Sequence, residues 1–448
     1  MLAKQNGICV VQGLALAILL PVAAGAFAEG PPIRRTGAAV DGGQSCTACH
    51  RSFIPANSGP GRVTLTAASY TPGVKQNLVV TVEDPQASRW GFELTARLRS
   101  DETKEAGTFT PVADTIRVAC DDGSTLGSAP PCNGAREFAT HLVASTQAGQ
   151  TGHGTFTVEW TPPAQDVGEI IFYFAGNAAN NNGNFTGDYI YTSSMVIRPA
   201  CNLTSKPTIT DIFDAASFRP VITSGQLMSV KGTGYSSSSG TFIAYSSDLV
   251  GGKLDTKLAC IAVEVGGKRA PVYSMVSTQV NVQAPQLDAT GSLNVQVIAN
   301  PGTSNELRSD VKSVQVQAVA PALFTIDGKT AAGRNASKQL QILGLEVPAA
   351  PGDVVTIYGT GFGATNPAWG TGEFPDRVSP LTGALTVTIG GVTLQSADVP
   401  YAGASADAPG FYQFNLKIPA TLPDGDAAVK MTIGGASTQD GVTIPVKK

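Results

Sequence analysis

The sequence predicts an all-β protein with three immunoglobulin-like β-sandwich domains in tandem after a signal peptide. The first observation is composition: 448 residues include 50 Gly and 29 Pro, and only 14% are charged, which is typical of many strands joined by turns. The second is a set of short stretches in which apolar and polar residues alternate, which places one face of each strand in a core. The third is an internal repeat in the second half of the chain.

The first 28 residues have the pattern of a secretory signal peptide. Lys4 precedes an apolar run over residues 10–24, and Ala26-Phe27-Ala28 follows as a small-x-small cleavage signature. The alternative is a membrane anchor, but the run is short for a bilayer span. No later stretch is long and apolar enough to span a membrane. We therefore expect a secreted, periplasmic or cell-surface protein with no membrane span in the mature chain.

Residues 29–60 form an N-terminal segment that carries a C-x-x-C-H motif at Cys46, Cys49 and His50. This spacing is the signature of covalent haem c attachment, with two thiols as anchors and the histidine as the proximal iron ligand. Structural zinc needs four ligands, and no second Cys/His pair stands at ligand spacing. A disulfide across C-x-x-C is the third interpretation, but such bonds usually sit in a thioredoxin-like fold, which nothing here resembles.

The other cysteines bear on that choice. Cys120 and Cys132 bracket a turn-rich loop, so a disulfide between them is the natural interpretation outside the cytoplasm. Cys201 and Cys260 can pair as well, although sequence does not determine connectivity. If both pairs form, the two motif cysteines are left together for one covalent haem c.

Alternating strands predict a sandwich over residues 61–200. They lie within 61–73, 76–84, 88–98, 153–163 and 168–197. The polar loop at 176–189 has one carboxylate, Asp188, so its Asn and Gly residues indicate tight turns more than a calcium site. An Asn-rich rim at the end of a sandwich can also line a haem pocket.

A haem iron that only transfers electrons usually takes a second axial ligand. We predict His141 as this distal ligand, because His153 stands between two glycines in what reads as a mobile turn. An axial ligand needs fixed geometry, which such a turn supplies poorly. The rivals are Met195 and an open sixth position.

Several motifs of this region resemble those of a known family. "YTPG", "WGFELTA", "ATH", "FTVEWTPP" and "FYFAGNAANNNGNFTGDYIYTSS" occur in this order and are similar to the bacterial Reelin-domain (Reeler, or choice-of-anchor V) family over about residues 40–198. The resemblance implies an immunoglobulin-like sandwich on a secreted or surface protein. Members often carry a "CTACH"-like motif after the signal peptide. His141 falls on the family histidine, whereas Phe138 departs from the usual tyrosine.

The remaining chain is a repeat. "SGQLMSVKGTGY" (224–235) matches "PGDVVTIYGTGF" (351–362), "TQVNVQAP" (278–285) matches "YQFNLKIP" (412–419), and "VEVGG" (263–267) matches "VTIGG" (387–391). The units resemble IPT/TIG-like immunoglobulin modules and divide the chain into residues 201–322 and 323–448. Residues 320–341 have the pattern of a link, from which the second copy can borrow its opening.

One further feature recurs in both copies. Gln279 with Asn281 corresponds to Gln413 with Asn415. These pairs are either a ligand site or, as we favour, side chains that cap turns or bond the backbone at a sheet edge.

Two functions follow. Net charge is −4 without a basic cluster, which argues against nucleic acid as a partner. No acid pair, nucleophile elbow or phosphate loop is present, so we expect no enzymatic activity. The first function is a secreted or cell-surface monohaem c-type cytochrome-like protein, for electron transfer or redox sensing, with a redox protein or an extracellular surface ligand as partner. The alternative is a non-enzymatic adhesion or matrix protein without haem.

Overall fold

The computed structural model of the chain describes residues 30–238 and 240–448, so the predicted signal peptide lies outside the described residues. The described chain is all-β, which confirms the predicted fold class. Within it, no helix is long and apolar enough to cross a membrane. The helices of the described residues are single 3-10 turns: η1 (Ala39–Asp41), η2 (Cys46–Ala48), η3 (Val143–Ser145), η4 (Ser246–Asp248), η5 (Ala336–Lys338) and η6 (Ser396–Asp398).

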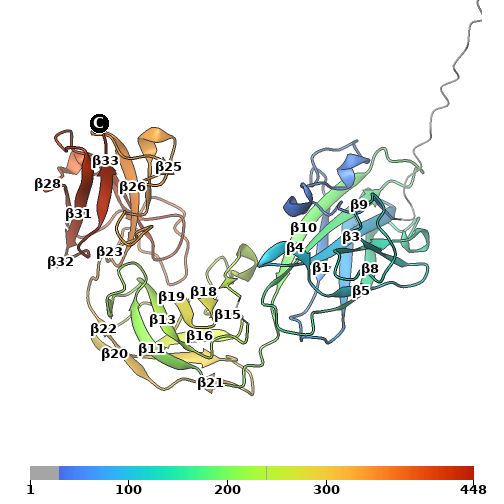
Figure 1. Cartoon of the computed structure of the whole chain (residues 1–448), viewed down its shortest axis with the longest axis horizontal. Coiled ribbons are helices and arrows are strands. Elements are labelled where there is room, and N and C mark those ends of the chain that lie inside the picture. Colours follow the sequence, from blue (N-terminus) through green and yellow to red (C-terminus); the bar gives the residue numbers. More distant parts are fainter. Residues whose placement is uncertain (1–29, 239) are drawn as a thin grey trace, which may run out of the picture.

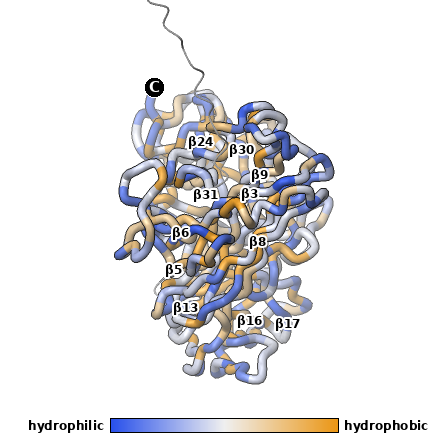
Figure 2. The backbone as a smooth tube through the Cα atoms, turned by 90° about the vertical axis from the view of Figure 1, so that its right-hand side faces the viewer, coloured by the Kyte–Doolittle hydropathy of each residue, from blue (hydrophilic) through white to orange (hydrophobic). Residues whose placement is uncertain are grey.

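The strands form three groups that follow one another along the sequence (Figure 1). Within the described residues, each group encloses a large hydrophobic core. These cores draw on residues 63–197, 203–316 and 323–446, and each range falls inside one predicted sandwich domain. Hydrophobic residues concentrate on the strands and hydrophilic ones on the connecting loops (Figure 2). We call these units the first sandwich, module 1 and module 2.

The first sandwich packs a four-stranded antiparallel sheet against a six-stranded one. The predicted strands over residues 61–197 are all present. The first sheet has the order β1 (Arg62–Thr66), β2 (Gln76–Asp84), β8 (Gly152–Thr161), β5 (Thr108–Thr110). The second has the order β10 (Tyr189–Ile197), β9 (Ile170–Ala179), β3 (Arg89–Leu98), β7 (Glu137–His141), β6 (Ile116–Cys120), with β4 (Asp101–Glu105) beside β3.

Strand β3 is buried on both faces. Trp90 and Phe92 point into the core, as the alternation predicts. The alternate residues of the strand, such as Glu93 and Arg97, point to the other face of the sheet. Both of these side chains are nevertheless fully buried. Their cover is the N-terminal segment, which packs on the outer face of this sheet. Residues 29–60 were expected as a separate segment, and here their described part completes the first sandwich.

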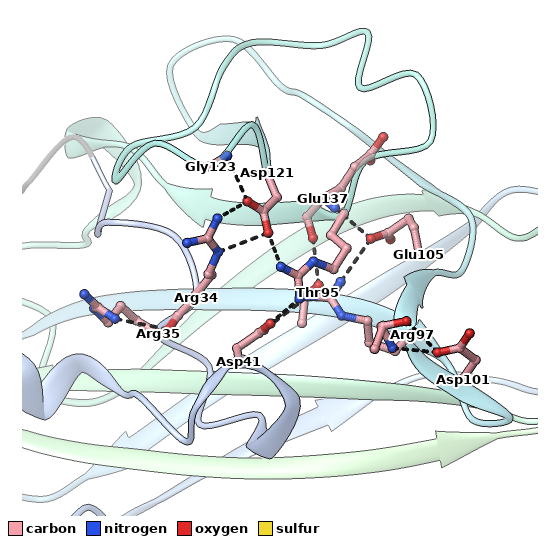
Figure 3. Close-up of polar contacts among 12 residues, drawn as sticks. Arg34, Arg35, Asp41, Thr95, Arg97, Asp101, Glu105, Asp121, Gly123 and Glu137 are labelled. Atoms are coloured by element: carbon pink, nitrogen blue, oxygen red, sulfur yellow. Dashed lines mark hydrogen bonds and ion pairs between the residues drawn. The ribbon is translucent and has the colours of Figure 1, made fainter.

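A cluster of buried charges holds this segment in place (Figure 3). Arg97 bridges Asp41 of the segment at 3.2 Å and Glu105 of β4 at 3.0 Å. Arg34, also of the segment, pairs with Asp121 after β6. Because burying charges is unfavourable unless they are paired and hydrogen-bonded, this cluster specifies one position of the segment on the sheet.

Modules 1 and 2 each pack two sheets, antiparallel except for the parallel pair β12–β22. The first sheet of module 1 has the order β11 (Thr208–Asp214), β13 (Leu227–Thr233), β19 (Gln279–Gln283), β18 (Val272–Val276), β14 (Phe242–Ile243). Its second sheet has the order β12 (Val221–Ile222), β22 (Lys312–Val316), β20 (Gly291–Ala299), β16 (Ile261–Val265), β15 (Lys257–Leu258), with β17 (Lys268–Ala270) beside β16 and β21 (Leu307–Arg308) beside β20. The first sheet of module 2 has the order β25 (Gln341–Ile342), β24 (Gly333–Asn335), β26 (Val354–Thr360), β30 (Tyr412–Lys417), β29 (Tyr401–Ala404), with β23 (Ala322–Leu323) beside β26. Its second sheet has the order β28 (Val392–Thr393), β27 (Leu385–Ile389), β31 (Gly425–Ile433), β32 (Ala436–Ser437), with β33 (Thr443–Val446) beside β31.

The repeated segments form equivalent strands. β13 and β26 come from the first matched pair of segments, and β19 and β30, their neighbours, from the second. Residues 320–341, expected as a link from which the second module borrows its opening, supply β23 and β24 to the sheet of module 2. Their apolar side chains are needed there, because Leu323 and Ala331 belong to its core.

The recurring Gln and Asn residues form side-chain networks. In module 1, Asn281 Oδ1 accepts from Ser229 Oγ at 2.7 Å and from Gln279 Nε2 at 2.8 Å. In module 2, Asn415 Oδ1 accepts from Thr356 Oγ1 and from Gln413 Nε2, both at 3.0 Å. These amides therefore link neighbouring strands side chain to side chain, rather than capping turns or bonding the backbone.

Both predicted disulfides are present. Cys120, the last residue of β6, is bonded to Cys132. Cys201 is bonded to Cys260. This disulfide joins the start of module 1 to the turn between strands β15 and β16. Among the described cysteines, only Cys46 and Cys49 are free.

Candidate functional site

A cavity of about 330 Å³ opens between the N-terminal segment and the outer face of the β3 sheet. Its volume is in the lower range of small-molecule sites. We call it the motif cavity, because all three motif residues line it. The other lining residues used below are Arg35, Arg89, Trp90, Gly91, Phe92, His141, Asn177, Asn181, Asn182, Asn184 and Asp188.

The motif forms a single tight turn. Ser45 caps η2 by accepting from the Thr47 amide at 3.3 Å. The Cys46 carbonyl then accepts from the amides of Cys49, at 3.2 Å, and His50, at 3.0 Å. The turn therefore brings two thiols and an imidazole to one wall of the cavity.

The thiols are free, and Cys46 is half-buried. Burial raises the pKa of the Cys46 thiol to about 12, and the nearby Glu93 carboxyl acts in the same direction. A thiol with a raised pKa stays protonated at neutral pH and is a poor nucleophile and metal ligand. At Cys46, this disfavours coordination of zinc by a thiolate.

His50 is held by a buried carboxylate from a distant part of the chain. Its Nδ1 lies 2.7 Å from Asp188 Oδ2, and Asp188 Oδ1 accepts from the Asn180 amide at 3.1 Å. Because a carboxylate only accepts, Nδ1 carries the proton. In the neutral ring, this leaves a lone pair on Nε2, which lies 3.4 Å from the Asn177 amide nitrogen. A carboxylate behind a ligating histidine is the common arrangement in metal sites.

His141 reaches the same cavity from β7. That strand pairs with β3 only at Thr140 and Ala139. The imidazole takes the place of the next backbone pair: Nδ1 lies 3.0 Å from the amide nitrogen and 3.1 Å from the carbonyl oxygen of Phe92. A Cβ on Gly91 would lie 2.7 Å from His141 Cε1. Glycine at residue 91 therefore provides the space through which the ring reaches the outer face.

Burial lowers the pKa of His141 to about 4, with Arg89 and His50 acting in the same direction. The ring is therefore neutral at physiological pH, as a metal-ligating imidazole must be. In one tautomer, His141 Nδ1 carries the proton and donates it to the Phe92 carbonyl, which leaves the lone pair on Nε2 free. The competing tautomer accepts from the Phe92 amide and carries its proton on Nε2.

The rival ligands lie elsewhere. His153 is the second residue of β8 and pairs with Glu83, so the prediction of a mobile turn is wrong. The His153 side chain is exposed and does not line the cavity. Met195 packs against the core of the first sandwich. Of the three candidates, only His141 lines the motif cavity.

The asparagine loop between β9 and β10 forms part of the cavity rim, through Asn181, Asn182 and Asn184. No group of three His, Cys, Asp or Glu residues able to hold a metal ion occurs within residues 30–238 and 240–448. The single loop carboxylate, Asp188, is instead bound to His50.

The asparagine loop over residues 176–189, which includes Asn177, was expected as a possible rim of the pocket, whereas sequence reasoning missed Gly91, Arg35, Arg89 and the bond between Asp188 and His50. Asn177 alternates with apolar neighbours in β9, and Gly91 interrupts "RWGFEL". An isolated glycine in a strand pattern signals a close approach of other groups, so Gly91 carried a readable signal. The residues that could hold a haem c are Cys46, Cys49, His50 and His141.

No family model matches the chain, and no curated protein matches it. Among solved structures, the Reeler domain of human F-spondin is similar at 16% identity, over 35% of this chain and 99% of that chain, with a TM-score of 0.23. The Reelin-N domain of F-spondin matches at 19% identity over 34% and 94%, with a TM-score of 0.22. A cohesin–dockerin complex of Clostridium thermocellum matches at 9% identity over 33% and 99%, with a TM-score of 0.21.

Proposed function

We propose that this chain is a non-enzymatic, extracytoplasmic protein that carries one covalent haem c and acts in electron transfer or redox sensing. The observation that carries the proposal is the convergence of four residues on one cavity. Cys46 and Cys49 are free while the other described cysteines are paired, and His50 and His141 approach from elements far apart in the sequence.

The residues present suit that group in three respects. The motif turn offers both thiols beside His50. Asp188 holds the His50 ring in the tautomer whose Nε2 can coordinate iron. His141 lines the same cavity, and burial keeps its ring neutral, which is the form that coordinates iron. Haem c, when bound, supplies a one-electron redox couple, with a potential that depends on its ligands and on burial.

The protein's own residues then have separable roles. Cys46 and Cys49 tether the group, His50 is the proximal ligand and Asp188 orients it and increases its basicity. His141 is the distal ligand, fixed by the Phe92 backbone. Trp90 and Phe92 border the cavity, and their side chains belong to the core of the first sandwich beneath it.

The first domain is proposed as a member of the bacterial Reeler family, and residues 201–448 as two IPT/TIG-like modules that serve as spacer or binding arms. The equivalent strands and networks of the two modules support their common origin. The two disulfides support a location outside the cytoplasm. A redox protein or a surface ligand would be the partner.

The test is expression with haem-maturation machinery, followed by haem staining of a denaturing gel. The wild-type chain should give a stained band, and the double variant Cys46→Ala, Cys49→Ala should not. The matched control, Cys201→Ala with Cys260→Ala, should keep the band. A matured wild-type chain without stain would refute the proposal and favour the haem-free adhesion protein.

The distal ligand is tested by the visible spectrum of the matured protein. His141→Ala should convert a low-spin haem to a high-spin one, because an axial ligand is removed. His153→Ala, which changes a histidine outside the cavity, should leave the spectrum unchanged. A low-spin spectrum in His141→Ala would show that another group is the distal ligand.

A further inference from the structure

Two arginines on the wall of the motif cavity have no carboxylate partner. Arg34 and Arg97, nearby, are both in ion pairs, whereas Arg35 and Arg89 pair with no carboxylate of the described chain. The Nε of Arg35 is buried without a hydrogen-bond partner, and its Nη1 reaches only the carbonyl of Arg34, at 3.4 Å. Arg89 donates through Nε to Thr146 Oγ1 at 3.2 Å.

The acidic groups around the cavity do not offset these charges. Glu93 lies under Arg35, and its Oε1 accepts from the Arg35 backbone amide at 3.0 Å. Its Oε2 is buried without a partner. Burial raises the pKa of Glu93 to about 8, so this carboxyl is largely neutral at pH 7. Asp188 is already bound to His50. Among the described residues, neither guanidinium group therefore has a carboxylate within ion-pair distance.

A guanidinium group presents a planar fork of donors that matches a carboxylate, and charge-assisted bonds of this kind are strong in partly buried sites. A buried donor without a partner is unfavourable until a ligand supplies the acceptor. Two arginines at one cavity thus indicate a ligand with two carboxylate groups.

We infer that Arg35 and Arg89 bind the two propionate groups of the haem. This inference rests on the proposed function. Arg35 precedes the motif by eleven residues and lies on the same segment, whereas Arg89 begins β3, next to Trp90 and Gly91. The two charges therefore reach the cavity from both of the structural parts that enclose it. The two guanidinium groups then set the orientation of the macrocycle in the cavity.

The inference is tested by comparing haemin with haemin dimethyl ester, in which both propionates are esterified. The protein is the full chain with Cys46→Ser and Cys49→Ser, so that binding is non-covalent and reversible. Absorbance titration should give a Kd for haemin lower than that for the ester by about tenfold or more, as expected for charge-assisted bonds. Arg35→Gln and Arg89→Gln should each reduce this ratio severalfold, and Arg35→Lys should reduce it less.

Arg51→Gln is the matched control. Arg51 follows His50 directly and is exposed outside the cavity lining, so its removal should leave the ratio unchanged. The ratio is taken within each variant, and a change in folded fraction affects both ligands equally. Equal affinity for the two ligands, binding of neither, or an equal effect of Arg51→Gln would overturn the inference. The haem stain of the matured wild-type chain reports on the proposed function separately.

Discussion

The first sandwich and the two modules use the same architecture differently. All three enclose an apolar core between two sheets. In the modules, the central strands carry small networks of hydroxyl and amide groups, such as that of Ser229 with Asn281. In the first sandwich, β3 carries Glu93 and Arg97 on its outer face and buries them under another segment.

The first sandwich and the modules also differ in how many buried polar side-chain atoms have no hydrogen-bond partner. Of seven buried side-chain atoms without a partner in the described residues, six lie in the N-terminal segment or the first sandwich, and one, Thr443 Oγ1, lies in module 2. Native proteins satisfy nearly all buried polar groups, and exceptions gather where a ligand or a strained site is found. The first sandwich therefore tolerates more unsatisfied polar groups than the modules do, and two of them, on Arg35 and Asn177, belong to residues that line the motif cavity.

The largest expected effect comes from the buried ion cluster. Arg97→Ala leaves Asp41 and Glu105 buried without their shared partner. Removing one member of a buried pair typically costs about 4 kcal/mol, so the first sandwich should unfold well before the modules in calorimetry. Arg62→Ala removes an exposed pair with Glu83 and should cost less than about 1 kcal/mol. Equal effects of the two changes would contradict the assigned role of the cluster.

The next effect depends on pH. Burial raises the pKa of Glu93 to about 8 from an ordinary value of 4.5. Between these values the unfolded chain binds fewer protons than the folded one, so stability falls as pH rises and levels off above pH 8. The Glu93→Gln variant has no ionisable group at this position, so its stability does not fall with pH for this reason. Its advantage in the free energy of unfolding should grow from pH 4.5 and reach about 3 kcal/mol at pH 7.

Urea unfolding of wild type and Glu93→Gln at pH 5 and pH 8 measures this advantage. Glu83, partly exposed on β2, provides the control: Glu83→Gln should give a nearly constant difference. A Glu93→Gln advantage that does not change with pH would show that the carboxyl is ionised in the folded protein.

The smallest effect compares the two modules. Tyr235 in module 1 corresponds to Phe362 in module 2, and both are fully buried. The Tyr235 hydroxyl donates to the Thr208 carbonyl at 2.9 Å. Tyr235→Phe makes module 1 resemble module 2 at this position and should cost about 1 kcal/mol, the typical net value of one hydrogen bond. An unchanged calorimetric transition would show that another donor serves that carbonyl.

The sequence by itself determined the strands, the repeat and the close spacing of the three motif residues. Alternation over residues 88–98 is sufficient for β3, since period-two apolar residues can be buried only on one face of a strand. The C-x-x-C-H spacing brings its three side chains together within one turn, because contacts so short in sequence need no tertiary information. Both disulfides were also predictable, with the Cys120–Cys132 loop the more evident.

Only the tertiary structure decided what surrounds the motif. Sequence alternation cannot show that the outer face of β3 is covered, because the cover comes from an N-terminal segment that is separated from β3 by two strands, β1 and β2. Asp188 reaches His50 across 138 residues, and His141 reaches the cavity because β7 separates from β3 and residue 91 has no side chain. These contacts depend on sheet order and on the packing of distant segments, and no local pattern encodes either of them.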